Sequence, residues 1–153
     1  MKMSVGVLIA VSLVVAGCAK QSSQKDAVAV TAEARKVLDS VSDSLRAKGL
    51  MGWISFLHNS PDFSWEFNGV QTSYDSLIAG ERAQAPLYRS IAMTWDSVKA
   101  ESVADNAMHL SAKFSEALAK ADGSVVIVKG RVDCRLERIA GTWKFTRGKT
   151  FDY

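Results

Sequence analysis

Histidine, cysteine and proline are all scarce in this chain. Among 153 residues there are two of each. The two histidines, His58 and His109, lie far apart in the sequence and form no metal-binding motif. Gly49, Gly52, Gly69 and Gly80 fall at separate element ends or on helix faces, without the spacing of a phosphate-binding loop. We therefore expect no metal and no cofactor.

A strong excess of charge of one sign is also missing. The chain has 19 Lys and Arg against 16 Asp and Glu, a formal charge of +3. Nucleic-acid binding requires basic residues that cluster on one face, and no such cluster is visible in the sequence. We expect no nucleic-acid partner.

Only one long apolar run is present, at the N-terminus. Lys2 gives a short positive start, residues 5–15 are almost all apolar, and small residues follow up to Cys18. A membrane-spanning helix needs about 20 apolar residues, so this run is too short to cross a bilayer. Its three-part pattern predicts a cleavable export signal over residues 1–17.

The end of this signal resembles the lipobox of bacterial lipoproteins. Val15, Ala16, Gly17 and Cys18 match its pattern, with Val15 in place of the usual leucine. The resemblance implies cleavage after Gly17, a diacylglycerol on the Cys18 sulfur and an acylated amine, and hence a lipid anchor to the membrane. The alternatives are an ordinary secretory signal with an incidental Cys18, or a transmembrane anchor.

Several expectations follow from a lipidated Cys18. Residues 18–25 are polar and would form a short flexible tether, and residues 26–153 have a length that suits one domain. The protein would lie in the bacterial cell envelope. Ala19 favours the periplasmic face of the outer membrane if the host has two membranes. Cys134 would then have no partner within the chain for a disulfide.

The first half of the domain contains mostly helical patterns. Apolar residues from Val30 to Leu45 recur every three or four positions, which predicts a helix that starts near Asp26 and stops at Gly49. A second short helix follows over residues 50–57. Residues 63–67 alternate as a strand does, and Asn68-Gly69 predicts a hairpin turn. Ser73 is expected to cap a third helix over residues 74–84, and Pro86 to kink it or to start another helical piece.

Strand patterns dominate from residue 92 onward. We expect four strands over residues 93–103, 107–118, 124–138 and 142–151, separated by turn signals at residues 105–106, 122–123 and 140–141. The connections are short, so the strands should form an antiparallel meander.

This order of elements resembles the nuclear transport factor 2-like and SnoaL-like superfamily. The resemblance rests on residues 60–69, on residues 74–77 and on the closing run 141–146. It implies an α+β fold in which N-terminal helices pack in the concave face of a curved antiparallel sheet, shaped like a cone. It also implies a pocket at the open end of the cone.

Strand alternation predicts which side chains face that pocket. The opposite faces carry a ladder of mixed charges, which is typical of a solvated sheet surface. Arg147 shares the parity of Trp143 and Phe145, so we expect it to line or rim the pocket, with an acidic partner or an anionic ligand. The expected lining residues are Trp65, Phe67, Tyr88, Met108, Leu110, Phe114, Val128, Val132, Trp143, Phe145 and Arg147.

Three functions remain open. The first is an envelope lipoprotein that binds a small apolar or amphipathic ligand, or a protein partner, without catalysis. The second is a SnoaL-like isomerase or hydratase that acts on a small hydrophobic carbonyl compound, with Asp96 or Glu66 as the base and Tyr88 as the hydrogen-bond donor. The third is a structural module at the membrane that forms a homodimer through the sheet.

Overall fold

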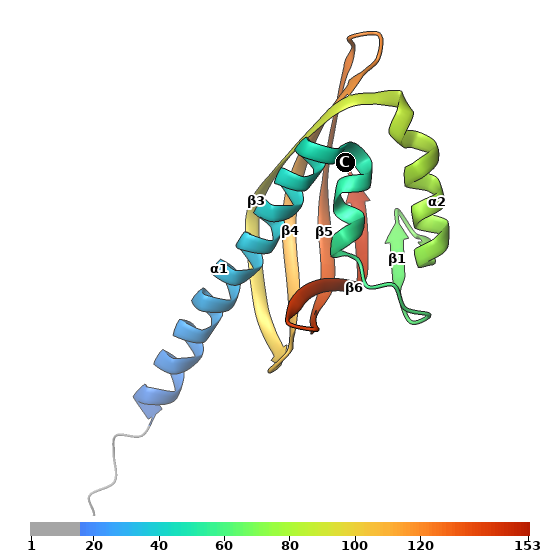
Figure 1. Cartoon of the computed structure of the whole chain (residues 1–153). Coiled ribbons are helices and arrows are strands. Elements are labelled where there is room, and N and C mark those ends of the chain that lie inside the picture. The colour runs from blue at the N-terminus through green and yellow to red at the C-terminus, as the bar shows by residue number, and fades with distance from the viewer. Residues whose placement is uncertain (1–15) are drawn as a thin grey trace, which may run out of the picture.

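The computed structural model describes residues 16–153, with side chains from residue 26 onward (Figure 1). Residues 1–15 of the expected signal peptide, and the Cys18 side chain, lie outside the described part. The elements in chain order are α1 (Ala16–Lys48), η1 (Gly49–Phe56), β1 (Ser64–Phe67), β2 (Val70–Thr72), α2 (Tyr74–Gln84), η2 (Ala85–Leu87), β3 (Tyr88–Ala104), β4 (Ala107–Lys120), β5 (Val125–Ile139) and β6 (Thr142–Asp152).

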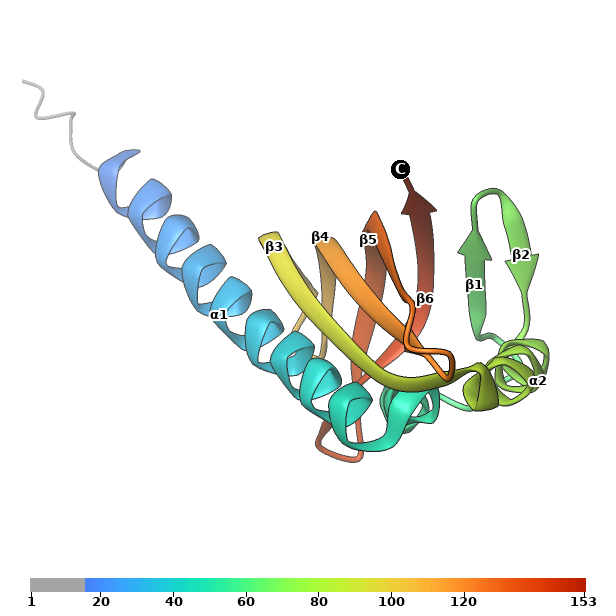
Figure 2. The same ribbon diagram turned by 90° about the horizontal axis from the view of Figure 1, so that it is seen from above.

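The six strands form one curved sheet in the order β2-β1-β6-β5-β4-β3 (Figure 2). The helices pack on its concave face, which confirms the expected α+β cone. Neighbouring strands are antiparallel except β1 and β6, which pair in parallel. The expected purely antiparallel sheet is therefore wrong at this pair. β1 comes from the early hairpin and joins the last strand, and a pairing between segments this distant is not visible in local patterns.

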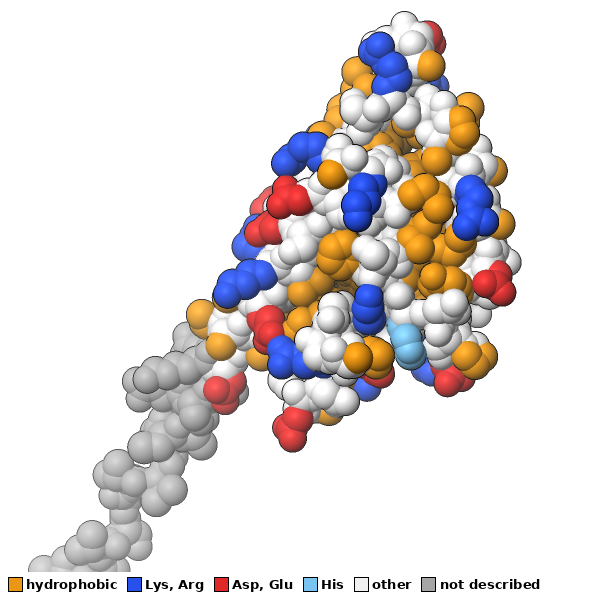
Figure 3. Space-filling view, viewed as in Figure 1, with side chains coloured by type: hydrophobic (Ala, Val, Ile, Leu, Met, Phe, Trp, Pro, Cys, Tyr) orange, Lys and Arg blue, Asp and Glu red, His pale blue; other side chains and the backbone are white. Residues whose placement is uncertain are grey.

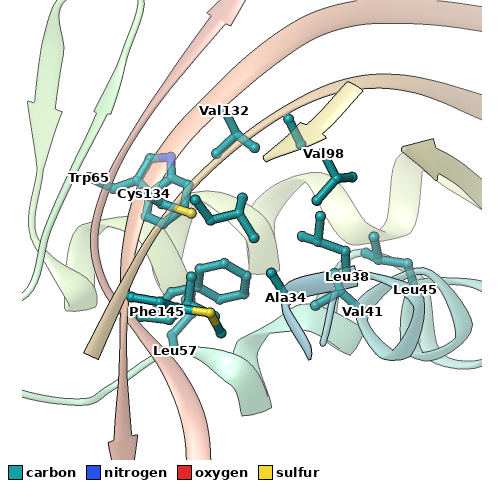
Figure 4. Close-up of a cluster of buried hydrophobic side chains, with 14 of the residues drawn as sticks. Ala34, Leu38, Val41, Leu45, Leu57, Trp65, Val98, Val132, Cys134 and Phe145 are labelled. Carbon is teal, nitrogen blue, oxygen red and sulfur yellow. The ribbon is translucent and has the colours of Figure 1, made fainter. Parts of the chain in front are cut away.

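Helix α1 packs its apolar face against the sheet. Ala34, Leu38, Val41 and Leu45 are at most 4% exposed, as their spacing predicts. They face Val98, Val132, Cys134 and Phe145 across the core (Figure 4). The Trp95 indole Nε1 on β3 donates to the Leu38 carbonyl at 3.0 Å and to the Ser42 hydroxyl at 2.8 Å, which fixes the helix along β3.

The helix begins earlier than its apolar pattern predicted. Its backbone is helical from Ala16, so residues 18–25 continue the helix instead of forming a flexible tether. The reason is that polar residues such as Gln and Lys have good helix propensity and can extend an existing helix. No helix in the described part of the chain is both long and apolar enough to cross a membrane.

Residues with local conformational preferences determine where the short elements of the fold begin and end. Gly49 (φ +66°) ends α1, and Asn68 (φ +48°) with Gly69 (φ +89°) makes the hairpin turn between β1 and β2. The Ser73 hydroxyl accepts the Ser76 amide at 3.3 Å and caps α2, whose bounds match the prediction. Pro86 lies inside a short 3₁₀ turn, η2, which directly follows α2, and β3 starts at Tyr88. Of the two alternatives expected for Pro86, a further helical piece that continues beyond Leu87 is wrong.

Bulges reverse the inward and outward faces of strands, and two of them bear on the expected site residues. In β3 the register shifts between Asp96 and Lys99, where Ser97 has φ +52°. In β6, Leu136 pairs with Phe145 and Arg135 pairs with Arg147, so Thr146 is an extra residue. An extra residue changes the face of every side chain that follows it. Phe145 and Thr146 are both buried, and Arg147 is turned to the exposed outer face.

Candidate functional site

A cavity of about 480 Å³ lies between the helices and the inner face of the sheet. Hydrophobic side chains gather in the middle of the face shown in Figure 3, beside α2. The cavity has the size and mainly apolar character of small-molecule sites in proteins. Its walls are Leu38, Val41, Leu45, Leu50, Trp53, Trp65, Phe67, Val70, Thr72, Ser76, Leu77, Gly80, Glu81, Gln84, Tyr88, Met93, Trp95, Phe114, Glu116, Leu118, Val128, Val132, Phe145, Thr150 and Asp152.

Most of the side chains expected to line a pocket do line this cavity. They are Trp65, Phe67, Tyr88, Phe114, Val128, Val132 and Phe145. Met108 and Leu110 face inward as expected, but they are at most 1% exposed and belong to the core. The expectation that they line the pocket is wrong, because other core side chains cover them.

Trp143 and Arg147 also lie outside the cavity. The Trp143 indole Nε1 donates to the Glu33 carboxylate at 2.8 Å, and the Arg138 guanidinium stacks on the ring. Trp143 therefore links the sheet to α1 away from the cavity. Arg147 is exposed on the outer face because of the Thr146 bulge. The prediction that Arg147 lines or rims the pocket is wrong.

Aromatic rings make up much of the cavity wall. Trp65 is at the centre of this cluster, with ring centroids at 5.6 Å from Trp53 and 5.9 Å from Phe145. Its indole Nε1 donates to the Thr150 hydroxyl at 3.0 Å. Gly148 allows this approach, since a Cβ there would lie 2.6 Å from the Trp65 ring. The wall is therefore held in one orientation by contacts and a hydrogen bond.

Three carboxylates lie on the wall of this apolar cavity. Glu81 comes from α2, Glu116 from β4 and Asp152 from the end of β6. Burial raises the pKa of Glu81 to about 7, against the lowering effect of a hydrogen bond with Trp53, and the charge of Glu116 raises it further. Burial also raises the pKa of Glu116, and the charge of Asp152 adds to this rise. Glu116 therefore interacts electrostatically with both of the other acids.

The fold fixes where these acids stand. Glu116 lies in β4 opposite Met93 of β3 and Val128 of β5, which both line the cavity. Asp152 is held by the hairpin turn: Asn68 Nδ2 donates to its carboxylate at 3.2 Å, and the Asp152 amide donates back to Asn68 Oδ1 at 3.0 Å. Within residues 26–153, none of the cavity-lining side chains is Lys, Arg or His. The cavity wall built by these residues therefore offers the acids no cationic partner.

The two expected bases point away from the cavity. Asp96 is exposed on the outer face, and its carboxylate accepts the Ser97 amide at 2.7 Å in the β3 bulge. Glu66 alternates with the inward Trp65 and Phe67, and it pairs with Lys149 at 3.2 Å on the outer face. Both are wrong as cavity bases for the same reason, the alternation of side chains along a strand. Tyr88, the expected hydrogen-bond donor, does line the cavity.

Sequence reasoning missed Glu81 and Glu116, although a signal for each was present. Glu116 has the same parity as Phe114 and Leu118, so it interrupts an apolar strand face. Glu81 is four residues after the buried Leu77, which places both on one face of α2. In both cases, an acidic residue on the otherwise apolar face of a strand or helix indicated a candidate site residue.

Cys134 has no role in this site. It is buried in the core, its thiol is free, and burial raises its pKa. A neutral, inaccessible thiol behaves as a small apolar side chain. Among the described residues no group of three or more His, Cys, Asp or Glu is arranged to hold a metal ion.

Several solved structures have the same architecture as this chain. A provisionally assigned scytalone dehydratase from Novosphingobium aromaticivorans is similar with a TM-score of 0.70 at 12% identity, over 87% of this chain and 88% of that chain. A nuclear transport factor 2-like superfamily protein from Salmonella enterica serovar Typhimurium has a TM-score of 0.64 at 15% identity, over 80% and 90%. The hexachlorocyclohexane dehydrochlorinase LinA has a TM-score of 0.59 at 12% identity, over 88% and 85%.

Other comparisons identify no relative. No family model matches the chain, and no curated protein matches it. The structural similarities establish the nuclear transport factor 2-like fold. At these identities they do not transfer an activity, because this fold supports many functions.

Proposed function

We propose that this nuclear transport factor 2-like domain binds a small apolar or amphipathic ligand in its cavity, and that it does so at the bacterial cell envelope. The observation that carries the binding proposal is the cavity of about 480 Å³ with its aromatic and aliphatic walls. A folded protein rarely keeps a large contiguous apolar patch open to water unless that patch has a binding role. Trp53, Trp65 and Trp95 offer wide apolar faces for such a ligand.

A side chain that fills the cavity should remove binding. Gly80 lies on α2 in the cavity wall, and a Cβ there meets no atom within 4 Å. We expect Gly80→Leu to weaken binding of the neutral apolar dye Nile red by about tenfold or more, because buried apolar contact accounts for most of the affinity. The measurement is a fluorescence titration of the full chain with the dye. Independently, native mass spectrometry of the protein purified from its host detects any ligand that is already bound.

The control is Ala79→Leu, which adds a leucine at the neighbouring, exposed position of the same helix. It should leave dye binding unchanged. Circular dichroism of both variants verifies that the fold is kept. Equal dye affinity in the original protein and in folded Gly80→Leu would contradict a ligand site in this cavity.

The lipid anchor at Cys18 is a separate part of the proposal. It is supported by the Val15-Ala16-Gly17-Cys18 pattern after a short apolar run. Two or three acyl chains hold a protein at a membrane more firmly than one chain does. We expect Cys18→Ser to block cleavage and to abolish the lipid mass at the N-terminus, as read by mass spectrometry. A Cys18→Ser protein whose processing matches the original, and whose mass differs from it only by the replaced side chain, would end this part of the proposal.

A second candidate function is acid–base catalysis on a small hydrophobic carbonyl compound. The observation that favours it is Glu81, whose pKa of about 7 suits proton transfer near neutral pH. Tyr88 lines the same cavity and offers a hydroxyl for the carbonyl oxygen. Two of the structural neighbours are named as a dehydratase and a dehydrochlorinase. Turnover of a cavity-bound ketone that is lost in Glu81→Gln would select catalysis over simple binding.

Dimerisation through the sheet stays a prediction. The outer face carries ion pairs between Arg131 and Asp133 and between Arg135 and Glu137, at 2.9 and 2.7 Å. These pairs fit the solvated ladder of mixed charges expected from the sequence. The proposed ligand-binding function rests on the cavity.

A further inference from the structure

The sign of the charge inside the cavity limits which ligands fit it. Glu81, Glu116 and Asp152 come from three different elements, and all three line the same cavity. Over the part of the chain that the structure describes, the lining includes no lysine, arginine or histidine. The chain as a whole is positive, with a formal charge of +3. The acidic lining is therefore a local property of the cavity and not a result of overall composition.

These carboxylates repel one another across the cavity. Burial separates Glu81 and Glu116 from water, and their charged neighbours on the wall are carboxylates of the same sign. Trp53, which also lines the wall, lowers the pKa of Glu81 but carries no charge. A buried carboxylate is stabilised by a cation close to it, so a positively charged ligand group would supply what the wall lacks.

The aromatic wall is compatible with a cation as well as with an apolar chain. Trp53, Tyr88 and Trp95 line the cavity beside the acids. The faces of such rings attract ammonium groups, most strongly where water is excluded. The aliphatic walls, formed by residues such as Leu45 and Val128, accept an uncharged body. An anionic head group would instead face three carboxylates.

We infer that the cavity selects a cationic amphiphile, a molecule with an apolar body and one protonated amine or quaternary ammonium group placed among Glu81, Glu116 and Asp152. This inference rests on the proposed ligand-binding function and specifies the class of ligand. It assigns the charged end to the acids and the apolar end to the aromatic and aliphatic walls.

Three probes with the same ten-carbon tail separate charge from hydrophobicity. Decyltrimethylammonium is cationic, decanol is neutral and decanoate is anionic near neutral pH. Their dissociation constants are measured by displacement of Nile red from the full chain. We expect the ammonium probe to bind about tenfold tighter than decanol, and decanoate to bind most weakly. Glu116→Gln should remove most of this advantage while decanol binding is kept.

Matched controls exclude indirect effects. Glu101→Gln removes one acid from the exposed outer face of β3 and should leave all three affinities unchanged. Glu81→Gln repeats the test at a second acid, should Glu116→Gln fail to fold. Any probe binding that remains in Gly80→Leu measures partition into lipid or adsorption to the protein surface. This background is subtracted from the binding measured with the original protein.

The outcomes distinguish the inference from the function on which it rests. Equal affinity for the three probes, or tightest binding of decanoate, would overturn cation selection and leave ligand binding intact. A cation preference that survives in both Glu81→Gln and Glu116→Gln would also overturn it. If no probe displaces the dye and the dye itself does not bind, the proposed function fails together with the inference.

Discussion

Replacement of Gly52 by alanine is expected to lower the free energy of unfolding by about 3 kcal/mol. A Cβ at this position would lie 2.2 Å from the Ser44 carbonyl oxygen and 2.8 Å from the Leu45 amide nitrogen. Both atoms belong to the backbone of α1, which cannot move aside as a flexible side chain can. The Ser44 hydroxyl also donates to the Gly52 carbonyl at 2.7 Å, so the two segments would have to separate and strain this bond.

Denaturant unfolding of the full chain measures this change. The control is Gly80→Ala, since Gly80 lies in α2 and an added methyl group there would meet no atom within 4 Å. Alanine has the higher helix propensity, so this variant should gain up to about 1 kcal/mol. The two glycine-to-alanine changes should therefore act in opposite directions. A Gly52→Ala protein as stable as the original would show that η1 and α1 are not this close in solution.

Replacement of Glu81 by glutamine is expected to stabilise the protein above neutral pH. The pKa of Glu81 is about 7 in the fold and 4.5 ordinarily, so the folded state binds this proton more tightly than the unfolded state. The carboxyl therefore destabilises the fold progressively as the pH rises from about 4.5 to about 7. Glutamine removes this loss, and we expect a gain of about 1–3 kcal/mol at pH values above 7, with allowance for the part of the group that water reaches.

Unfolding free energies across a pH series test this prediction. Below the ordinary pKa, both states carry a protonated Glu81, so the original protein and Glu81→Gln should differ little there. Glu116, whose pKa is raised as well, leaves a smaller slope of the same sign in the variant. Glu101→Gln on the exposed outer face is the control and should follow the original profile. Parallel profiles for Glu81→Gln and the original would contradict a buried Glu81.

The short elements of this fold could be predicted because their signals are local. The hairpin turn needs positive φ angles at Asn68 and Gly69, and these residue types adopt them readily. Ser73 caps α2, and the apolar spacing from Ala34 to Leu45 marks the buried face of α1. Each of these features depends on residues that lie close together in the chain.

The bulges and the β1–β6 pair could not be predicted in the same way. Nothing in the residues around Thr146 specifies that it is extra, because a bulge is defined by the partner strand. This single residue turned Arg147 outward and made the expected charged pocket rim wrong. The inward acids were predictable in part: the parity of Glu116 and the spacing of Glu81 from Leu77 were visible, but which strand and helix faces enclose a cavity was not.

The sequence by itself determined the periodicities, caps and turns, and through them the order of helices and strands and the apolar faces that they bury. It also carries the lipobox-like ending at Cys18, from which the proposed anchor follows. Only the tertiary structure decided which polar side chains share the cavity, because Glu81, Glu116 and Asp152 meet through strand register and helix docking. Register depends on contacts between distant segments, and one extra residue in a strand exchanges its inner and outer faces.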